Sequence, residues 1–181
     1  MKKILVIGST GAGKSTLAKK MAERLGLAYI DLDDFHHLPG WQERPAEEFR
    51  SLADAATLGE KWVVAGNYYS KVRDITWSRA DTVIWIDLPF WPNFLQLLRR
   101  TLKRACTGEI ICNGNKETLA KQFFSGNSIL LWLLKTWRAN RERYGKIFAQ
   151  PGDYPHLTFV RLESHRQIGA FLESLPAGAV A

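Results

Sequence analysis

The sequence predicts an α/β fold built on a parallel sheet, and three observations support this fold class. Segments typical of buried strands alternate with segments typical of helices from one end of the chain to the other. The first strand, residues 4–7, is a continuous apolar run that ends at Gly8, as expected of a strand buried on both faces. After it, apolar residues recur at four-residue intervals at Leu17, Met21 and Leu25, which indicates a helix. We therefore expect right-handed crossovers and helices on both faces of the sheet.

The remaining elements follow from the same two patterns. Short apolar runs predict four further strands, at residues 28–30, 62–65, 82–86 and 157–162. Helices are expected from Pro45 to Gly59, from Leu95 into a basic region, twice between residues 116 and 144 with a break at Gly126 and Asn127, and after the capping box Ser164-x-x-Gln167. We expect one domain over residues 1–181, with a core at 1–98 and 156–175 and a basic helical region at about 99–146.

Composition limits the class of protein. The chain has 181 residues, of which 46% are hydrophobic and 24% charged, values typical of a soluble globular protein. No apolar run approaches the roughly 18 residues that a membrane span requires, and a strand begins almost at the N-terminus, so we expect neither a membrane partner nor a signal peptide. Two cysteines, Cys106 and Cys112, are too few for a disulfide framework or a four-cysteine zinc site. We therefore expect a cytoplasmic protein without zinc.

Residues 8–15 satisfy the pattern G-x-x-x-x-G-K-[ST], which is typical of a phosphate-binding loop. Glycines let the backbone turn with its N–H groups pointing inward, and the helix after the loop directs its positive end at the anion. Lys14 can reach the terminal phosphates of a nucleotide, and the Ser15 hydroxyl can ligate magnesium. The flanking strand and helix disfavour a glycine-rich turn without a ligand. The expected nucleotide-binding residues are Gly8, Ser9, Thr10, Gly11, Ala12, Gly13, Lys14, Ser15 and Thr16.

Other patterns distinguish the classes of P-loop protein. The chain has no D-x-x-G switch, no L-S-G-G-Q transporter signature and no N-K-x-D guanine reader, since residues 115–118 lack the aspartate. Its length leaves little room for the appendages of a motor. A small kinase needs the loop, a magnesium environment, an acceptor pocket and cations that neutralise the transferring phosphoryl group. Candidates for all four are present, so we expect an ATP-dependent kinase.

The net charge of +7 is concentrated in one part of the chain. Between Leu95 and Gln150 there are eleven Lys or Arg and three Glu, whereas the remainder is nearly neutral. Such a block could bind nucleic acid or a membrane surface, or it could close over a triphosphate as a lid. Beside a nucleotide-binding motif we prefer the lid, and nucleic acid is the second choice.

Further segments form a recognisable set with the phosphate-binding loop. They are residues 31–33, 39–41, 62–68 and 80–89 and the pair Arg100-x-x-x-Arg104, which together cover about the first 105 residues. On these segments the chain resembles the adenylate-kinase-related P-loop proteins, and within them the group labelled DNA topology modulation proteins. The resemblance implies a P-loop NTPase three-layer sandwich with five parallel strands in the order 2-3-1-4-5 and a helical lid, and it implies ATP, Mg²⁺ and phosphoryl transfer. Residues 65–69 depart from the Asp-Gly-Phe-Pro-Arg of adenylate kinases, which disfavours AMP as acceptor.

An acidic cluster follows the second strand. Asp31 and Asp33 alternate, so on an extended chain both side chains project to the same side, next to the loop. We expect Asp33 to accept a proton from the acceptor hydroxyl and, with Ser15, to hold Mg²⁺, while Asp31 contacts the substrate. The pair resembles the D-x-D of shikimate kinases. The alternative is a solvated acidic turn or a helix cap, the role that we assign to Asp34.

Basic side chains are the candidates for the lid. Arg100 and Arg104 are four residues apart and share a helix face. They resemble the lid arginines of nucleotide kinases, so we expect them to act in catalysis beside Lys14; a solvated basic helix is the alternative. A second lid contribution is expected from residues on or near one face of a later helix, namely Arg138, Arg141 and Arg143.

The acceptor side of the site is less defined by motif. In open α/β sheets, loops beyond the carboxyl ends of the strands build the site. Polar and aromatic residues after the second and third strands are therefore the candidates, and these are Trp41, Arg44, Asn67, Tyr68 and Arg73. We expect Trp41, Arg44, Asn67 and Arg73 to bind substrate, although Trp41 could stack on a base or serve as a packing anchor. Asp87 ends an apolar strand and mimics a Walker B aspartate, but the implied strand order puts it away from the usual position.

Taken together, these patterns predict ATP- and Mg²⁺-dependent phosphoryl transfer to a nucleotide, nucleoside or small hydroxylated metabolite. Two alternatives stay open. One is a nucleic-acid-associated P-loop protein that acts in topology modulation or end-phosphorylation. The other is a nucleotide sensor without turnover.

Overall fold

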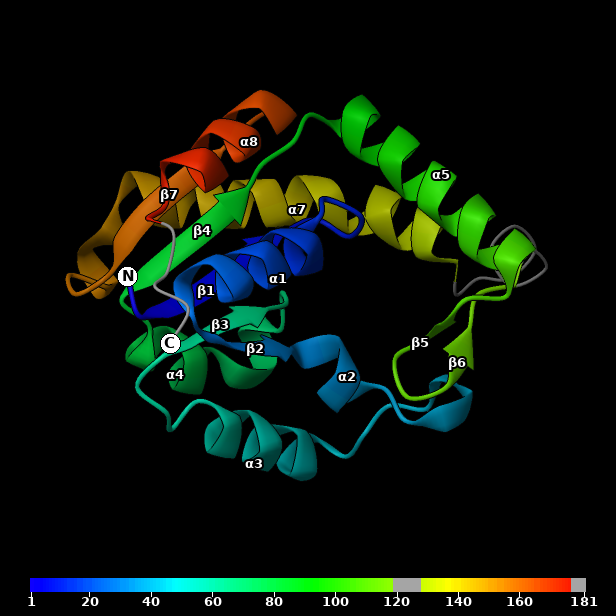
Figure 1. Cartoon of the computed structure of the whole chain (residues 1–181), viewed down its shortest axis with the longest axis horizontal. Coiled ribbons are helices and arrows are strands. Elements are labelled where there is room, and N and C mark those ends of the chain that lie inside the picture. The colour runs from blue at the N-terminus through cyan, green and yellow to red at the C-terminus, as the bar shows by residue number, and fades with distance from the viewer. Residues whose placement is uncertain (119–127, 177–181) are drawn as a thin grey trace.

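The strands form one parallel sheet in a computed structural model that describes residues 1–118 and 128–176. They are β1 (Lys3–Gly8), β2 (Ala28–Asp31), β3 (Trp62–Ala65), β4 (Thr82–Ile86) and β7 (Thr158–Leu162), in the order β2-β3-β1-β4-β7 (Figure 1). Leu5 of β1 pairs with Val64 on one side and Val83 on the other. Because β7 is the fifth strand along the chain in this sheet, the expected order 2-3-1-4-5 is confirmed.

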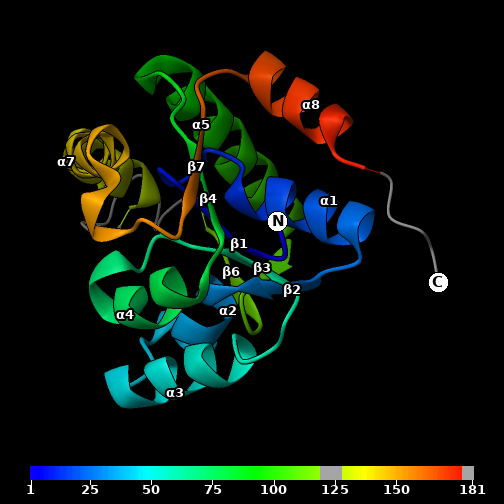
Figure 2. The same cartoon turned by 90° about the vertical axis from the view of Figure 1, so that its left-hand side faces the viewer.

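Helices cover both faces of the sheet (Figure 2). On one face lie α1 (Lys14–Leu25) and α8 (His165–Ser174), and on the other lie α3 (Ala46–Ala56), α4 (Tyr69–Arg79) and α7 (Ile129–Ala149). Successive side chains of β1 explain the two layers, since Ile4 and Val6 pack in the core under α1, whereas Leu5 and Ile7 pack in the core under α3 and α4. The predicted three-layer α/β sandwich is confirmed.

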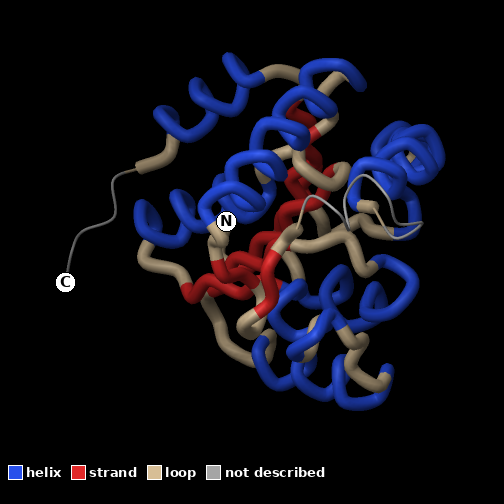
Figure 3. The backbone as a smooth tube through the Cα atoms, turned by 90° about the vertical axis from the view of Figure 1, so that its right-hand side faces the viewer, coloured by secondary structure: helices blue, strands red, loops and turns tan. Residues whose placement is uncertain are grey.

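Most of the remaining elements lie beyond the carboxyl ends of the strands. They are α2 (Leu32–His36), the short 3₁₀ helix η1 (Pro39–Trp41), α5 (Phe90–Thr107), and an antiparallel hairpin of β5 (Ile110–Ile111) and β6 (Asn115–Lys116). A second 3₁₀ helix, η2 (Pro151–Asp153), instead connects α7 to the amino end of β7. A small apolar cluster of Leu97, Leu130 and Leu133 joins α5 to α7. Figure 3 views this side of the molecule, with helices on both sides of the strands. Within the described ranges, no helix is long and apolar enough to cross a membrane.

The structure differs from the sequence prediction between residues 108 and 149. A hairpin precedes one long helix, α7, and the expected helix break at Gly126 and Asn127 lies outside the described residues. The hairpin turn has positive φ at Cys112, Asn113 and Gly114, of 37°, 60° and 87°. Asparagine followed by glycine is a strong hairpin signal, but the flanking strands are too short to show alternation. The sequence prediction also missed α2 and α4.

Candidate functional site

The phosphate-binding loop lies between β1 and α1, as the motif predicts. Gly8, Gly11 and Gly13 have φ of 150°, 78° and 98°, values that disfavour residues with a side chain. The backbone N–H of Gly8 donates to Oδ1 of Asn67 at 2.9 Å, which ties the loop to the end of β3. Since α1 begins at Lys14, its free N–H groups face the loop and favour an anion there.

Helix α5 braces the loop from one side. Asn93 Nδ2 donates to the carbonyl of Thr10 at 3.1 Å, and Gln96 Nε2 donates to the carbonyl of Gly11 at 2.5 Å. A Cβ at Gly11 would lie 2.7 Å from Cβ of Leu97, so this position requires glycine for packing as well as for its φ. Sequence reasoning missed Asn93 and Gln96, because no local pattern shows that α5 contacts the loop.

Lys14 lies among charged groups from three elements. Its Nζ donates to the carbonyl of Ser9 at 3.1 Å. Burial lowers the pKa of Lys14, the negative charges of Asp33 and Asp31 oppose this, and the positive charge of Arg100 adds to it. These interactions place Lys14, Asp33 and Arg100 close enough for their charges to act on one another, which is the arrangement expected of a phosphoryl-transfer site.

The acidic cluster has a different geometry from the one predicted. Asp33 does not continue an extended chain, because β2 ends at Asp31 and α2 begins at Leu32. Asp31 caps this helix, since its Oδ1 accepts a hydrogen bond from the N–H of Asp33 at 3.1 Å. The prediction of Asp34 as the cap is therefore wrong. The physical reason is local: an aspartate before a helix satisfies a free N–H two residues later.

Asp33 nevertheless faces the interior of the site. Tyr68, which follows β3, donates its hydroxyl proton to Oδ1 of Asp33 at 2.8 Å. Burial raises the pKa of Tyr68, and the charge of Asp33 raises it further, so the phenol stays protonated and donates. The structure thus supplies an orienting partner for Asp33 from a neighbouring strand.

Oxygen atoms suitable for Mg²⁺ lie beside Lys14. The Tyr29 hydroxyl donates to Oδ2 of Asp31 at 2.6 Å and also interacts with the Ser15 hydroxyl; burial, and then Asp31, raise the pKa of Tyr29. A hydroxyl and carboxylates are ligands that Mg²⁺ prefers. In the described part of the chain, no group of three or more His, Cys, Asp or Glu is placed to hold a metal ion. The protein oxygens fit a magnesium ion that takes its other ligands from phosphate and water.

Arg100 and Arg104 meet at one buried carboxylate. Both approach Oε1 of Glu117, at 3.9 Å from Arg100 and 3.3 Å from Arg104, and the Glu117 side chain is 2% exposed. Arg104 also pairs with Glu109 at 3.4 Å. Burial lowers the pKa of Arg100, and its neighbour Arg104 lowers it further. The pair shares a helix face as predicted, but only Arg100 acts on Lys14, and sequence reasoning missed Glu117.

The arginines of α7 separate in the structure. Arg138 pairs with Glu142 at 3.1 Å, Arg141 pairs with Oδ1 of Asp87 at 3.2 Å, and Arg143 lies over the ring of Tyr69. The three therefore contact different partners, and the expectation that they make a second lid contribution from one helix face stays a prediction. Asp87 is buried and also binds Arg161, so its carboxylate is already engaged on both oxygens.

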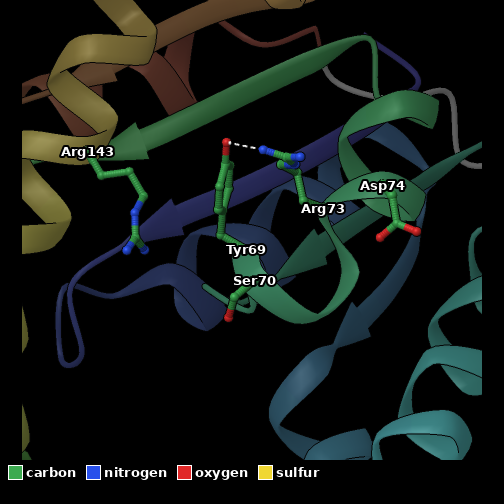
Figure 4. A pocket seen from close by; sticks show the side chains of 5 residues that line it. All are labelled: Tyr69, Ser70, Arg73, Asp74 and Arg143. Atoms are coloured by element: carbon green, nitrogen blue, oxygen red, sulfur yellow. Dashed lines mark hydrogen bonds between the residues drawn. The ribbon is translucent and has the colours of Figure 1, made fainter.

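The predicted substrate-binding residues divide into two kinds. Trp41 donates two hydrogen bonds to the hairpin. Its backbone N–H donates to Oδ1 of Asn115 at 2.8 Å, and its Nε1 donates to the carbonyl of Lys116 at 3.1 Å. Arg44 donates to the carbonyl of Phe35 and to Glu48, and Asn67 holds Gly8. These three support the loops around the site. Arg73 instead lines a cavity of about 440 Å³ (Figure 4).

The hairpin is fastened to α2 and η1 beside the acidic cluster. Asn113 Nδ2 donates to the carbonyls of Asp34 and His37, both at 2.6 Å, and Asn115 Nδ2 donates to the carbonyl of Leu38 at 3.0 Å. Burial, and then the charges of Asp33 and Asp34, raise the pKa of the Cys112 thiol to about 12. The hairpin therefore covers the acidic cluster from the side of the basic region.

Comparison with known sequences finds kinases that match parts of this chain. The family model of shikimate kinase matches residues 10–51, which hold most of the loop and the acidic cluster. An uncharacterized protein of Bacillus subtilis, YqaC, is 27% identical over 130 residues, 71% of this chain and 72% of its own. A shikimate kinase of Parabacteroides distasonis is 36% identical over 61 residues, 29% of this chain and 34% of its own.

Solved structures share the fold. A shikimate kinase from Acinetobacter baumannii, in complex with shikimate, superposes with a TM-score of 0.59 at 15% identity, over 96% of this chain and 89% of that one. At this identity the likeness establishes the P-loop kinase fold, the broad class that adenylate kinases share. The narrower resemblance to DNA topology modulation proteins stays a prediction. The family match, the relatives and the phosphate-binding loop together indicate a small-molecule kinase with the P-loop kinase fold.

Proposed function

We propose that this protein transfers the terminal phosphoryl group of ATP, with Mg²⁺, to a hydroxyl group of a small hydroxylated metabolite. The observation that carries the proposal is the phosphate-binding loop between β1 and α1, with Lys14 as the first residue of α1 and with the charges of Asp33 and Arg100 acting on it. The three come from α1, α2 and α5, and together they provide a phosphate-binding cation, a base and a second cation. The family match over residues 10–51 supports it, because that range holds Lys14 and both aspartates.

Each residue has a role that follows from its position. The loop N–H groups and Lys14 bind the β- and γ-phosphates. Asp33 accepts the proton of the acceptor hydroxyl, and the Tyr68 hydroxyl keeps the carboxylate oriented. The acceptor oxygen then bonds to the γ-phosphorus as the bond to the bridging oxygen breaks, and ADP leaves. Arg100 neutralises charge on the transferring group.

The side chains near Tyr29 are the proposed site of Mg²⁺. Ser15 would ligate it, with Asp31 or Asp33 holding a bound water; the contact of Tyr29 with both Ser15 and Asp31 favours Asp31. When bound, the ion neutralises charge on the phosphate oxygens. Asp33 then keeps its oxygens for the acceptor and for Tyr68.

We further propose that residues 99–146 act as the lid of a domain whose core is 1–98 and 156–175. Arg100 and Arg104 are held by Glu117, and Arg141 is held by Asp87, so several basic side chains of this region already have carboxylate partners. The charge of Arg100 also acts on Lys14 of the phosphate-binding loop, which favours the lid over nucleic-acid binding. If the protein binds DNA at low salt and this binding weakens steeply as the salt concentration is raised, nucleic-acid binding is favoured instead.

The test is ADP release from Mg·ATP across a panel of hydroxy acids, sugars, polyols and nucleosides. Lys14→Ala should abolish transfer. Asp33→Asn should lower kcat by about 100- to 10,000-fold, the usual contribution of a general base, while Kd for ATP changes little. Asp34→Asn removes one charge from the same cluster and is the matched control, with turnover close to wild type. Full turnover by Asp33→Asn would refute the assignment of the base, and no acceptor-dependent ADP release with any compound would refute the kinase.

A further inference from the structure

Two carboxamide side chains of α5 hold the phosphate-binding loop from outside. Nδ2 of Asn93 donates to the carbonyl of Thr10 at 3.1 Å, and Nε2 of Gln96 donates to the carbonyl of Gly11 at 2.5 Å. The partners are 83 and 85 residues apart in the sequence. Figure 1 shows α5 running from the end of β4 to the β5–β6 hairpin. Two successive carbonyls of the loop are therefore held by one helix that lies outside the motif.

The peptide groups of the loop transmit these contacts to its inner side. A trans peptide is planar, so the carbonyl of one residue and the N–H of the next point in opposite directions. Asn93 thereby fixes the direction of the N–H of Gly11. Gln96 does the same for the N–H of Ala12, which donates to the carbonyl of Ser9 at 3.1 Å and closes the turn of the loop. The hydrogen bonds from α5 therefore set the orientation of N–H groups in the loop.

Asn93 occupies its position at a cost in stability. The residue is fully buried, and its Oδ1 has no hydrogen-bond partner among residues 1–118 and 128–176. A buried acceptor without a partner costs free energy, so an apolar side chain would be more stable at this position. Residues that break such a rule concentrate at functional sites. The bond from Asn93 to the loop explains why an amide is present there.

His165 fixes the amide of Gln96 from a third segment. Its Nε2 lies 2.6 Å from Oε1 of Gln96, and because a carboxamide oxygen has no proton to give, His165 is the donor. The opposite orientation of the amide would place its oxygen against the carbonyl of Gly11, where two acceptors would repel each other. His165 is the first residue of α8, just after β7. The end of β7 is therefore linked to the loop through Gln96.

The face of α5 that holds the loop also carries Arg100. Residues 93, 96, 97 and 100 are three or four apart in sequence, so they lie on one side of the helix. Leu97 packs against Gly11 and belongs to the buried cluster that joins α5 to α7. The positive charge of Arg100 acts on Lys14. One anchored helix therefore holds the loop and also carries a cation of the proposed site.

We infer that Asn93 and Gln96 are positioning residues for the phosphates of ATP, and that His165 acts through Gln96. They hold the loop so that its N–H groups are oriented before the nucleotide binds, which lowers the entropy lost on binding. A hydrogen bond to a carbonyl also polarises its peptide group and strengthens the N–H of that group as a donor. The inference rests on the proposed ATP site and adds three residues outside the motif to it.

The experiment is calorimetric titration of Mg·ATP, Mg·ADP and inorganic tripolyphosphate, which needs no acceptor. Gln96→Met keeps the length of the side chain but removes its donor and its acceptor. His165→Ala removes the group that holds Gln96, and Asn93→Ala removes the other contact with the loop. Leu95→Ala is the control, because Leu95 is an exposed neighbour on the same helix. Thermal unfolding without ligand checks that each variant is folded.

Gln96→Met should raise Kd for all three ligands about 2- to 10-fold, the usual effect of losing one neutral hydrogen bond. Tripolyphosphate should lose as much affinity as ATP, because the loop binds phosphates and not the base. His165→Ala should raise Kd in the wild-type background and leave it unchanged in the Gln96→Met background. Asn93→Ala should also raise Kd. Asn93 is buried, so its variant is the one at risk of unfolding, and the other two decide the test on their own.

Wild-type Kd values in Gln96→Met, or an equal loss of affinity in Leu95→Ala, would overturn the inference and leave the kinase standing. An equal effect of His165→Ala in both backgrounds would overturn the link through Gln96. Failure of the wild type to bind ATP or tripolyphosphate would refute both proposals. Weakened binding in the variants, with no acceptor-dependent ADP release by the wild type, would support the inference and refute the kinase.

Discussion

Replacing Gly66 with alanine should displace the acidic cluster, because Gly66 packs directly on the residue between the two aspartates. A Cβ at Gly66 would lie 2.8 Å from Cβ of Leu32 and 3.1 Å from its Cδ1. Real Cβ contacts are longer, and Leu32 is buried, so the added methyl group must push α2 away from β3. The φ of Gly66, 148°, is a second source of strain for alanine.

The magnitude follows from these two terms. Overpacking a buried site costs about 1–3 kcal/mol, and an unfavourable backbone conformation costs about 1–3 kcal/mol. We expect Gly66→Ala to lower the free energy of unfolding by about 2–6 kcal/mol, or Tm by roughly 10 °C for a chain of this size. Because Leu32 lies between Asp31 and Asp33, kcat should also fall about 10-fold or more, with ATP binding retained.

Urea unfolding of a double-mutant cycle tests this reasoning. Leu32→Ala removes Cδ1 and Cγ, two of the three atoms that the new methyl group would meet, and by itself costs about 2–5 kcal/mol. The double variant should be less destabilised than the sum of the single variants. Gly59→Ala is the control, since nothing lies within 4 Å of its Cβ and its φ is not in the left-handed region. Single-variant effects that add to within about 0.5 kcal/mol would refute a steric contact between these residues.

Three further predictions concern charged and titratable groups. Glu117→Gln should lower the free energy of unfolding by about 1–2 kcal/mol, because the buried carboxylate pairs with both Arg100 and Arg104. Glu142→Gln, at the exposed pair with Arg138, should change it by at most about 1 kcal/mol. Equal effects of the two variants in urea unfolding would contradict the pairing. Asp87→Asn should lower the free energy of unfolding by about 2–4 kcal/mol, since Arg141 and Arg161 lose one buried partner. Asp54→Asn, at a half-exposed ion pair with Arg79, is the control, and a matching loss in both variants would count against the cluster. At pH 8, iodoacetamide should label the folded chain on the exposed Cys106 alone. Burial and nearby aspartates raise the pKa of Cys112 to about 12, so its reactive thiolate forms only as the pH rises toward that value. Mass spectrometry should find two labels after denaturation, and rapid labelling of Cys112 in the folded chain at pH 8 would disprove the shift.

The sequence was most informative where a feature depends on neighbouring residues. The phosphate-binding loop is a contiguous segment, and its glycines, Lys14 and Ser15 have positions set by the turn itself. The strands were found because burial on both faces makes each a continuous apolar run, and their order followed from the family resemblance. The acidic cluster was found for the same reason, but its geometry was not, since a local hydrogen bond from the N–H of Asp33 to Asp31 starts α2 one residue after Asp31.

Contacts between distant segments could not be predicted in this way. Nothing near Asp33 in the sequence indicates Tyr68, and nothing near Arg100 indicates Glu117, because each pair meets only when strands and helices pack. The same is true of Arg141, which we grouped with Arg143 from their spacing, although the fold directs one to Asp87 and the other to Tyr69.

The sequence alone therefore determined the α/β class and the position of the phosphate-binding loop, because both depend on short-range patterns of burial and backbone conformation. Tertiary structure decided which carboxylate caps a helix and which accepts a hydrogen bond from Tyr68, and which arginine acts on Lys14. Charges act across space rather than along the chain, so their partners become defined only when the sheet and its helices are assembled.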